Sequence, residues 1–313
     1  MNPAKNKLIR LERSTLFVPA LPYAMIEKAA ASDADAVCVD LEDSVAIDEK
    51  AAGRANAIRA FQELDFGRRT TILRINDLEG PFAYRDLVET VEGAGERMDL
   101  IMIPKVNSRE DVVFVDMLLK QIEAHCRLAR GIGLEAQIET AAGFLAVREI
   151  AQSSARLEAL IFGPGDYAAS MQMPSMSIGE LDRYDEMYPG HRWHAVMHAI
   201  VASARANGLR CMDGPYAAHK DPAGLERSCQ IARAMGFDGK QCIHPKQTAL
   251  ANGVFSPTGE EVAQAKQIVD AYEQAVGRNR GVASLNGKMI DAASVRMAKG
   301  VLERHGLING KNR

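Results

Sequence analysis

The chain has 313 residues, of which 47% are hydrophobic and 25% charged, so it can bury a large core. Its net charge is −3 and its basic residues are dispersed, which gives no support for a nucleic-acid partner or an anionic membrane surface. The five cysteines are far apart and form no Cys-x-x-Cys pair, which argues against a disulfide framework or a zinc finger. No apolar run approaches the ~18 residues of a transmembrane helix, and we expect a cytoplasmic protein.

Short apolar runs alternate with helix-forming stretches along the chain. The predicted strands are 14–19, 36–40, 70–75, 99–104, 132–139, 157–166, 209–213 and 238–243, and the predicted helices include 25–32, 48–64, 81–92, 108–126, 191–207 and 222–235. Pro81 is expected at the first position of its helix. Eight alternations within about 255 residues predict an α/β fold, a (β/α)8 TIM barrel. A doubly wound sheet, the alternative, would carry a Gly-rich first turn, and Phe17-Val18-Pro19-Ala20 is not one.

The segment after the predicted barrel has a different pattern. A helix is expected at 258–277, a hairpin turn at Asn286-Gly287 and a second helix at 292–305. We therefore predict a TIM barrel catalytic domain over 1–255 and a C-terminal helical lid and oligomerisation segment over 256–313. This segment is too small for a core of its own, so we expect it to pack on the barrel or on a neighbouring subunit.

Two carboxylates close neighbouring predicted strands. Glu139 ends the run 132–139 and Asp166 ends the run 157–166. Acids at the C-terminal ends of barrel strands lie where this fold places its chemistry. Hard oxygen ligands without nearby Cys or paired His favour Mg²⁺ over Zn²⁺. The alternative is that each acid caps the helix that follows it.

Five of the eight predicted strands end in an acid or are followed at once by one, including Asp40, Glu42 and Asp43. So many acids on one rim require cations, and Arg74 and Lys105 supply only two, which favours a divalent metal. Asp40, Glu42 and Asp43 could hold metal-bound waters, or cap the chain near Ser44. Arg74 fits an oxyanion clamp or an ion pair with a rim acid. Lys105 could form a Schiff base, but the acids would keep it charged.

Two further motifs fit ordinary structural roles. His191, His194 and His198 share a predicted helical face at a spacing that can bind zinc, but no acid completes such a site, so we favour a packing role. Gly163-Pro164-Gly165 is too short for a phosphate loop, and we expect a tight turn that presents Asp166.

Nine short motifs follow one another along nearly the whole chain. They are Arg13-Ser14-x-Leu16-Phe17-x-Pro19, Asp40-Leu41-Glu42-Asp43-Ser44-Val45, Arg74-Ile75-Asn76, Ile103-Pro104-Lys105, Ile138-Glu139-Thr140-Ala141, Phe162-Gly163-x-x-Asp166, Gly239-Lys240, Ile243-His244-Pro245 and Gly287-Lys288-x-Ile290-Asp291. In these motifs the chain resembles the HpcH/HpaI aldolase–citrate lyase beta-subunit superfamily. Tyr84-Arg85-Asp86, Asp166-Tyr167-Ala168-Ala169-Ser170, Asp213-Gly214-Pro215 and Trp193-His194 are most similar to the malyl-CoA/β-methylmalyl-CoA lyases.

The resemblance implies roles for individual residues. Glu139 and Asp166 would bind Mg²⁺, with Mn²⁺ as an alternative, and Arg74 would hold the thioester or its enolate oxygen. Asp291 would reach in from a neighbouring subunit, and Glu42 and Asp43 would complete the catalytic set. The residues expected along coenzyme A (CoA) are Phe17, Lys28, Arg74, Gly165, Ile243 and His244. A homotrimer or homohexamer is expected.

The sequence departs from the lyase pattern in three places. Ala20 follows Pro19 where the family has glycine, and Leu21-Pro22-Tyr23 replaces a stretch that carries an arginine for a CoA phosphate. The loop between Met171 and His191 is also shorter. These departures concern CoA and the acyl chain, not the metal site.

The resemblance implies a Mg²⁺-dependent carbon–carbon lyase. The expected substrate is a malyl-type 3-hydroxyacyl-CoA, and the products are acetyl-CoA or propionyl-CoA and glyoxylate. The alternatives are a citramalyl-CoA lyase that releases pyruvate, a malyl-CoA thioesterase, and a citrate-lyase beta-like subunit that depends on an acyl-carrier partner.

Overall fold

The computed structural model describes residues 10–174, 177–187, 192–278 and 280–310. The chain divides into two compact units, 1–252 and 253–313. The division falls within helix α11 (Pro245–Val254), near the predicted end of the barrel. In the described residues, no helix has both the length and the apolar character needed to cross a membrane.

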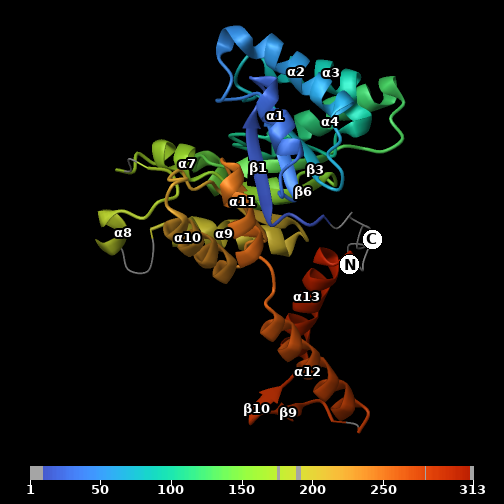
Figure 1. The fold of residues 1–313 in the computed structure, drawn as a ribbon, viewed down its shortest axis with the longest axis vertical. Helices are drawn as coiled ribbons and strands as arrows, with labels where there is room; N and C mark the ends of the chain where they lie inside the picture. The colour runs from blue at the N-terminus through green and yellow to red at the C-terminus, as the bar shows by residue number, and fades with distance from the viewer. Residues whose placement is uncertain (1–9, 175–176, 188–191, 279, 311–313) are drawn as a thin grey trace. The chain divides into compact units, whose positions relative to one another are not determined.

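Unit 1 is a closed barrel of eight parallel strands in sequence order, which confirms the (β/α)8 prediction (Figure 1). The strands are β1 (Ser14–Pro19), β2 (Ala36–Asp40), β3 (Thr70–Arg74), β4 (Leu100–Ile103), β5 (Gly133–Ile138), β6 (Leu157–Phe162), β7 (Arg210–Asp213) and β8 (Gly239–Cys242). Pairing of β1 with β8, in which Leu16 lies opposite Cys242, closes the barrel. Closure removes the open strand edges and gathers all strand ends on two rims.

Helices surround the strands (Figure 1). They are α1 (Tyr23–Ala30), α2 (Lys50–Glu63), α3 (Ala83–Ala94), α4 (Arg109–Cys126), α5 (Ala141–Leu145), α6 (Val147–Ala151), α7 (Pro164–Ser170), α8 (Arg183–Met187), α9 (His194–Ala206), α10 (Pro222–Met235) and α11. Ser108 caps α4 through a capping box, and Asp221 caps α10, whose first residue is Pro222. These caps satisfy backbone N–H groups that have no partner within the helix.

Several predicted boundaries were wrong. Helix α3 begins at Ala83, so Pro81 precedes the helix and is not its first residue. Strand β6 ends at Phe162, because Pro164 has no N–H for the sheet and instead begins α7. The sequence analysis also missed α8 and α11. His191 lies outside the described residues.

A tightly packed core fills the barrel beneath the strand ends. Its buried members include Ala36, Cys38, Ile72, Leu100, Met102, Ile161 and Met212, and the ring of Phe17 packs against them. Interiors of this kind are packed as densely as organic crystals and have low compressibility. The core therefore provides a rigid floor for the side chains at the C-terminal rim.

Unit 2 is a helical hairpin with a small sheet. Helices α12 (Gly259–Val276) and α13 (Ala292–Ile308) flank the antiparallel strands β9 (Ala283–Leu285) and β10 (Lys288–Ile290). Asn286 and Gly287 both have positive φ angles, 51° and 76°, as a two-residue type I′ turn requires. The predicted hairpin is thereby confirmed.

Candidate active site

A cavity of about 400 Å³ opens at the C-terminal ends of the strands, where TIM barrels hold their active sites. The predicted site residues that line it are Phe17, Asp43, Arg74, Glu139, Gly165, Asp166 and Ile243. They come from six different strand ends or the segments that follow them. The barrel thus brings together residues up to 226 positions apart in the chain, from Phe17 to Ile243.

Glu139 follows β5 directly and is 1% exposed. Its Oε1 accepts the backbone N–H of Lys105 at 2.8 Å, and its Oε2 accepts a hydrogen bond from Gln137 Nε2 at 2.7 Å. Burial, together with the negative charge of Asp166, raises the pKa of Glu139 to about 8. The capping alternative is wrong for Glu139, because Thr140 caps α5 through its own hydroxyl.

Asp166 lies in the first turn of α7, and its side chain is 43% exposed. Gly163 occupies the N-cap position, so Asp166 does not cap this helix. The predicted tight turn at 163–165 is also wrong, since Gly165 already belongs to the helix. A Cβ atom on Gly163 would lie 2.2 Å from Glu139 Oε2, so only glycine allows this close approach of the β6–α7 junction to Glu139.

Arg74 ends β3 and binds the rim acids with a fork of hydrogen bonds. Its Nε and Nη2 donate to the two oxygens of Asp40 at 2.6 and 2.8 Å, and Nη1 lies 3.0 Å from Glu42 Oε2. The guanidinium also lies over the Phe17 ring, 5.3 Å from its centroid. These contacts confirm the ion-pair interpretation. The hydrogen bonds to Asp40 use two N–H groups of the five on a guanidinium, so Arg74 retains further donors.

The turn after β2 is held in place from two sides. Asp40 accepts the backbone N–H of Glu42 at 3.0 Å, and Lys50 Nζ donates to the carbonyls of Leu41 and Glu42, each at 2.7 Å. Burial raises the pKa of Asp40, but the Arg74 guanidinium outweighs this and holds that pKa below its usual value. Asp40 is therefore a charged structural anchor for Arg74 and for this turn.

Lys105 connects acids that follow two strands, β2 and β6. Its ammonium contacts Glu42, lies 3.2 Å from Asp43 Oδ2 and 3.9 Å from Asp166 Oδ1. Burial lowers the pKa of Lys105, but the hydrogen bond and charge of Glu42 outweigh it and hold the pKa above its usual value. A Schiff base needs a neutral amine, so this environment opposes one. The residue also has a φ of 48°, a strained conformation that functional sites often hold.

The donor set fits Mg²⁺. The described residues contain no group of three or more His, Cys, Asp or Glu side chains that could hold a metal. Glu139 and Asp166 are two carboxylates that line one cavity. This suits Mg²⁺, which keeps several waters and usually binds one or two carboxylates together with its substrate. A divalent cation would also remove the repulsion that raises the pKa of Glu139.

Four predicted residues lie outside this cavity. Lys28 is exposed on α1, and His244 stacks on His219 with ring centroids 5.2 Å apart. Glu42 contacts the site through Arg74 and Lys105. Asp291 belongs to unit 2, where its side chain caps α13 in a capping box with Ser294.

Helix α9 carries a pair of histidines. The rings of His194 and His198 lie 4.4 Å apart on the exposed side of the helix. His191 is outside the described residues, so the predicted three-histidine face is not tested.

Sequence reasoning missed Gln137 and Lys50. Gln137 precedes Glu139 by two residues, so both side chains point to the same side of the strand, a signal that was available in the sequence. No such signal exists in the sequence for Lys50, because its position in α2 does not indicate that it binds the carbonyls of Leu41 and Glu42.

Residues 13–245 match the family model HpcH/HpaI aldolase/citrate lyase. The L-malyl-CoA/β-methylmalyl-CoA lyase of Cereibacter sphaeroides is 42% identical over 306 residues, 96% of each chain. The malyl-CoA/β-methylmalyl-CoA/citramalyl-CoA lyase of Chloroflexus aurantiacus is 33% identical over 99% of this chain and 92% of its own. The crystal structure of CitE from Mycobacterium tuberculosis with magnesium, acetoacetate and coenzyme A has a TM-score of 0.75 and 28% identity, and the match covers 94% of this chain and 97% of CitE. This chain therefore belongs to the HpcH/HpaI aldolase/citrate lyase family.

Proposed function

We propose that this protein is a Mg²⁺-dependent carbon–carbon lyase for malyl-type 3-hydroxyacyl-CoA thioesters, with glyoxylate and acetyl-CoA or propionyl-CoA as products. The observation that carries the proposal is a buried acid, Glu139, that lines one cavity with Asp166 and Arg74, and whose pKa is affected by the charges of both. Relatives that match over nearly the full chain bear lyase names for these substrates.

Glu139 and Asp166 would hold the metal, which when bound supplies Lewis-acid polarisation of the oxygen that becomes the oxoacid carbonyl. Gln137 and the Lys105 backbone N–H fix the Glu139 carboxylate, so its orientation does not depend on the ligand. Lys105 in turn is held by Glu42 and Asp43, which assigns these two acids a positioning role.

Arg74 supports the charge that develops on the thioester. When the carbon–carbon bond breaks, its electron pair moves onto the thioester as an enolate, while the C–OH group becomes a carbonyl and releases its proton to water. A guanidinium whose fork is already fixed by Asp40 needs no reorganisation to donate to the enolate oxygen. We expect the CoA arm to contact Phe17, Gly165 and Ile243, which line the cavity, together with Lys28 and His244, which do not.

Asp291 is proposed to protonate the enolate carbon from a neighbouring subunit. Its hydrogen bonds to the backbone and hydroxyl of Ser294 lower its pKa in the single chain. An acid in this role needs a higher pKa, so we expect the neighbouring site to desolvate the carboxyl. This arrangement requires a homo-oligomer, and we propose a homotrimer or homohexamer in the cytoplasm, without a nucleic-acid partner.

A second candidate, citramalyl-CoA lyase, is favoured by one observation, the name of the Chloroflexus relative. Its pyruvate product differs from glyoxylate by one methyl group, which a pocket discriminates by only about 1–3 kcal/mol.

The test is to incubate the purified chain alone with malyl-CoA and Mg²⁺ and to measure glyoxylate and free thiol. Glyoxylate without thiol release supports the lyase, whereas thiol release without glyoxylate would identify a thioesterase. Activity only with an acyl-carrier partner would identify a citrate-lyase beta-like subunit. A parallel assay with citramalyl-CoA ranks the two lyase substrates.

A further inference from the structure

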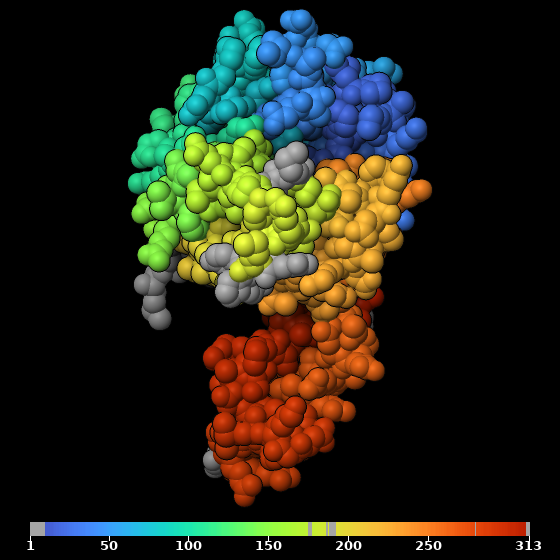
Figure 2. Space-filling model, turned by 90° about the vertical axis from the view of Figure 1, so that its left-hand side faces the viewer, coloured from blue at the N-terminus to red at the C-terminus, as the bar shows by residue number. Residues whose placement is uncertain are grey.

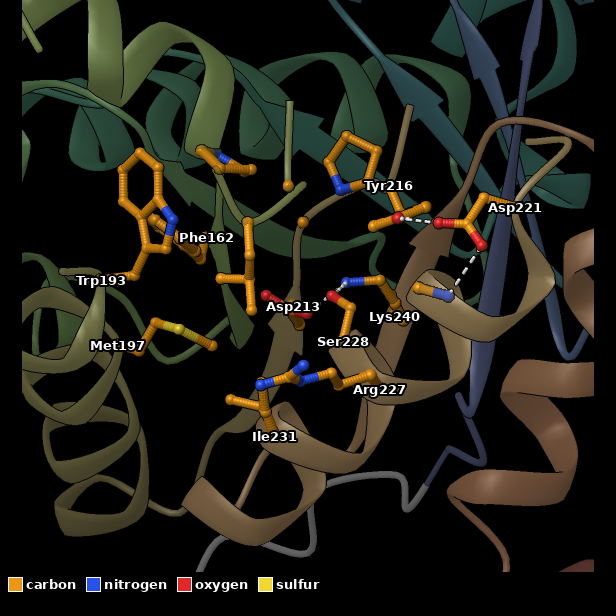
Figure 3. Close-up of a pocket in the computed structure, with 16 residues that line it drawn as sticks. Phe162, Trp193, Met197, Asp213, Tyr216, Asp221, Arg227, Ser228, Ile231 and Lys240 are labelled. Atoms are coloured by element: carbon orange, nitrogen blue, oxygen red, sulfur yellow. Dashed lines mark hydrogen bonds and ion pairs between the residues drawn. The ribbon is translucent and has the colours of Figure 1, made fainter. Parts of the chain in front are cut away.

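A second cavity, of about 230 Å³, lies outside the barrel wall and beside the candidate active site. It is bounded by β6, β7 and β8 on one side and by α9 and α10 on the other (Figure 3). Figure 2 shows the yellow-green segment that follows β6 beside the gold surface that includes α10. A single water needs only about 10–15 Å³ of such space, so the cavity has room for a ligand of several heavy atoms.

A thin, tight wall separates the two cavities. Pro164 and Pro215 line both of them. A Cβ atom on Gly214 would lie 2.1 Å from Pro164 Cδ and 2.5 Å from the Phe162 carbonyl oxygen, so the backbone here is already in close contact. A molecule in the second cavity therefore does not occupy the site that Glu139 and Asp166 form.

One wall of the second cavity carries a buried donor without a partner. Trp193 is 4% exposed, and its Nε1 has no hydrogen-bond partner among the described residues. Figure 3 shows this nitrogen on the edge of the indole that faces the other lining residues. Phe162, Met197 and Leu181 form the apolar surface around it. An indole N–H that is buried without an acceptor is costly, and a ligand oxygen would satisfy it.

The opposite wall is polar, and its unused groups are also donors. Lys240 is 1% exposed and donates to Asp213 and to Ser228 Oγ, the latter at 2.9 Å. Because Ser228 Oγ accepts from Lys240, its own O–H remains free to donate into the cavity. Arg227 lines the same wall, is exposed, and makes no ion pair with any residue in the described part of the chain.

The two acids near this wall are already neutralised or bound. Asp213 pairs with Lys240, and Asp221 accepts hydrogen bonds from the Tyr216 hydroxyl at 2.7 Å and from the Gly224 N–H at 3.0 Å. The side-chain groups that remain free to hydrogen-bond in this cavity are thus donors, and one of them is the charged guanidinium of Arg227. Such a set selects a monoanion with a second acceptor oxygen.

We propose that the second cavity binds a short-chain oxo- or hydroxycarboxylate. Its carboxylate accepts from Arg227 and Ser228, its chain lies against Phe162, Met197 and Leu181, and its second oxygen accepts from Trp193. Neither Glu139 nor Asp166 takes part, so this binding is separate from the proposed lyase reaction.

The chain provides its own reporter, because Trp193 is its only tryptophan. The probes are levulinate, which has a carboxylate and a distant ketone, and valerate, which has the same chain length without the ketone oxygen. We expect levulinate to change the tryptophan emission saturably in metal-free buffer. Valerate should bind about threefold or more weakly, because it cannot pair with the Trp193 N–H.

Variants test whether levulinate binds in the second cavity. Arg227→Gln should weaken levulinate about tenfold or more, whereas Arg148→Gln, an exposed arginine on α6, should have no effect. Asp166→Asn should also leave the affinity unchanged. In Trp193→Phe, calorimetry should give levulinate and valerate equal affinities, since the donor that distinguishes them is gone.

The following results would overturn the proposal. A change in emission that sodium chloride reproduces, or that does not saturate, means that levulinate has no site. Loss of the signal in Asp166→Asn means that levulinate binds in the candidate active site instead. An unchanged affinity in Arg227→Gln means that the carboxylate is held elsewhere. None of these readouts requires turnover, so failure here is distinct from failure of the lyase assay.

Discussion

Two glutamates at the two ends of β5 differ in their roles: one is structural, and the other is proposed to bind a metal. Glu135 lies within β5 and Glu139 directly follows it, and their even spacing places both on the same face of the strand. Both are buried, with exposures of 0% and 1%, and burial raises the pKa of each. Their partners differ. Glu135 pairs with Arg210 at 2.9 Å, whereas Glu139 accepts hydrogen bonds from an amide side chain and a backbone N–H.

The surroundings of the two acids extend this contrast. Near Glu135, Arg210 also pairs with Glu12 at 3.0 Å and with Glu158 at 2.9 Å, so one arginine compensates several acids. Near Glu139, the cations Arg74 and Lys105 are already bound to Asp40 and Glu42. Uncompensated buried charge is costly. The acid at the rim is therefore left in need of a cation, which is the physical reason for proposing a divalent metal there.

The largest effect is expected from removing that cation or its ligand. Exhaustive chelation with EDTA should abolish turnover, and Mg²⁺ or Mn²⁺ should restore it. Glu139→Gln should remain inactive at any Mg²⁺ concentration, because the amide cannot supply the anionic oxygen. Glyoxylate release from malyl-CoA is the measurement. Activity that survives chelation would contradict the metal mechanism. Borohydride trapping of substrate on Lys105 would instead support a Schiff base.

The next effect concerns Asp291, in unit 2. Asp291→Asn should abolish nearly all turnover and leave Mg²⁺ binding unchanged. Asparagine caps helices as well as aspartate does, so α13 should remain folded, as circular dichroism can verify. The substitution thus removes the titrating group alone.

Subunit mixing tests whether Asp291 acts across an interface. Arg74→Ala should also be nearly inactive, from a defect on the rim of unit 1. After exchange of subunits between the two variants, some sites would combine an intact Arg74 with an intact Asp291 from another chain, so activity should return. If mass spectrometry verifies the exchange and no activity appears, the proposed role of Asp291 in trans is wrong.

A smaller loss is expected at Arg74. Arg74→Lys keeps the positive charge but loses the fork that binds Asp40, so the donor toward the enolate is no longer held in place. We expect kcat to fall by about 10²-fold or more, with a smaller change in KM. A variant that changes only KM would mean that Arg74 contributes uniform binding and no charge stabilisation.

The sequence supported the barrel because its signals are local and periodic. Each strand is a short apolar run, and the order of strands and helices leaves few alternatives. The first residue of a helix was harder to predict. Pro81 has the residue type of a first helical position, yet Phe82 and Ala83 determine where α3 begins. Pro164 does occupy such a position, and it shortened a strand that the apolar run alone would have extended.

The candidate site was predictable to the extent that strand ends converge. Glu139, Asp166 and Arg74 were inferred in this way, and the cavity contains all three. What the sequence could not reveal is which cation each acid contacts. The pairing of Arg74 with Asp40, and of Lys105 with Glu42, depends on side-chain reach across neighbouring strands. The second cavity was equally hidden, because Trp193 and Arg227 are far apart in the chain and share no motif.

The smallest effect is expected at Glu135, the structural member of the pair. Glu135→Gln should change kcat little, because this residue lies at the far end of the strand from the cavity. The effect of this substitution is expected in the free energy of unfolding. Burial, with the charge of Glu12 added, raises the pKa of Glu135 well above its usual range even though Arg210 opposes this. The folded protein therefore releases this proton at a higher pH than the unfolded chain, which releases it near about pH 4.3.

The sign of the pH dependence follows from this difference in bound protons. Where the folded state binds more protons than the unfolded state, the free energy of unfolding falls as pH rises. In metal-free protein above about pH 4.3, Glu135→Gln should make the free energy of unfolding fall less steeply as pH rises. Urea unfolding at several pH values measures it, with Glu149→Gln, an exposed acid on α6, as the control. An identical slope in Glu135→Gln and the parent would mean that Arg210 keeps Glu135 ionised. The two ends of β5 would then differ only in their partners and not in their protonation.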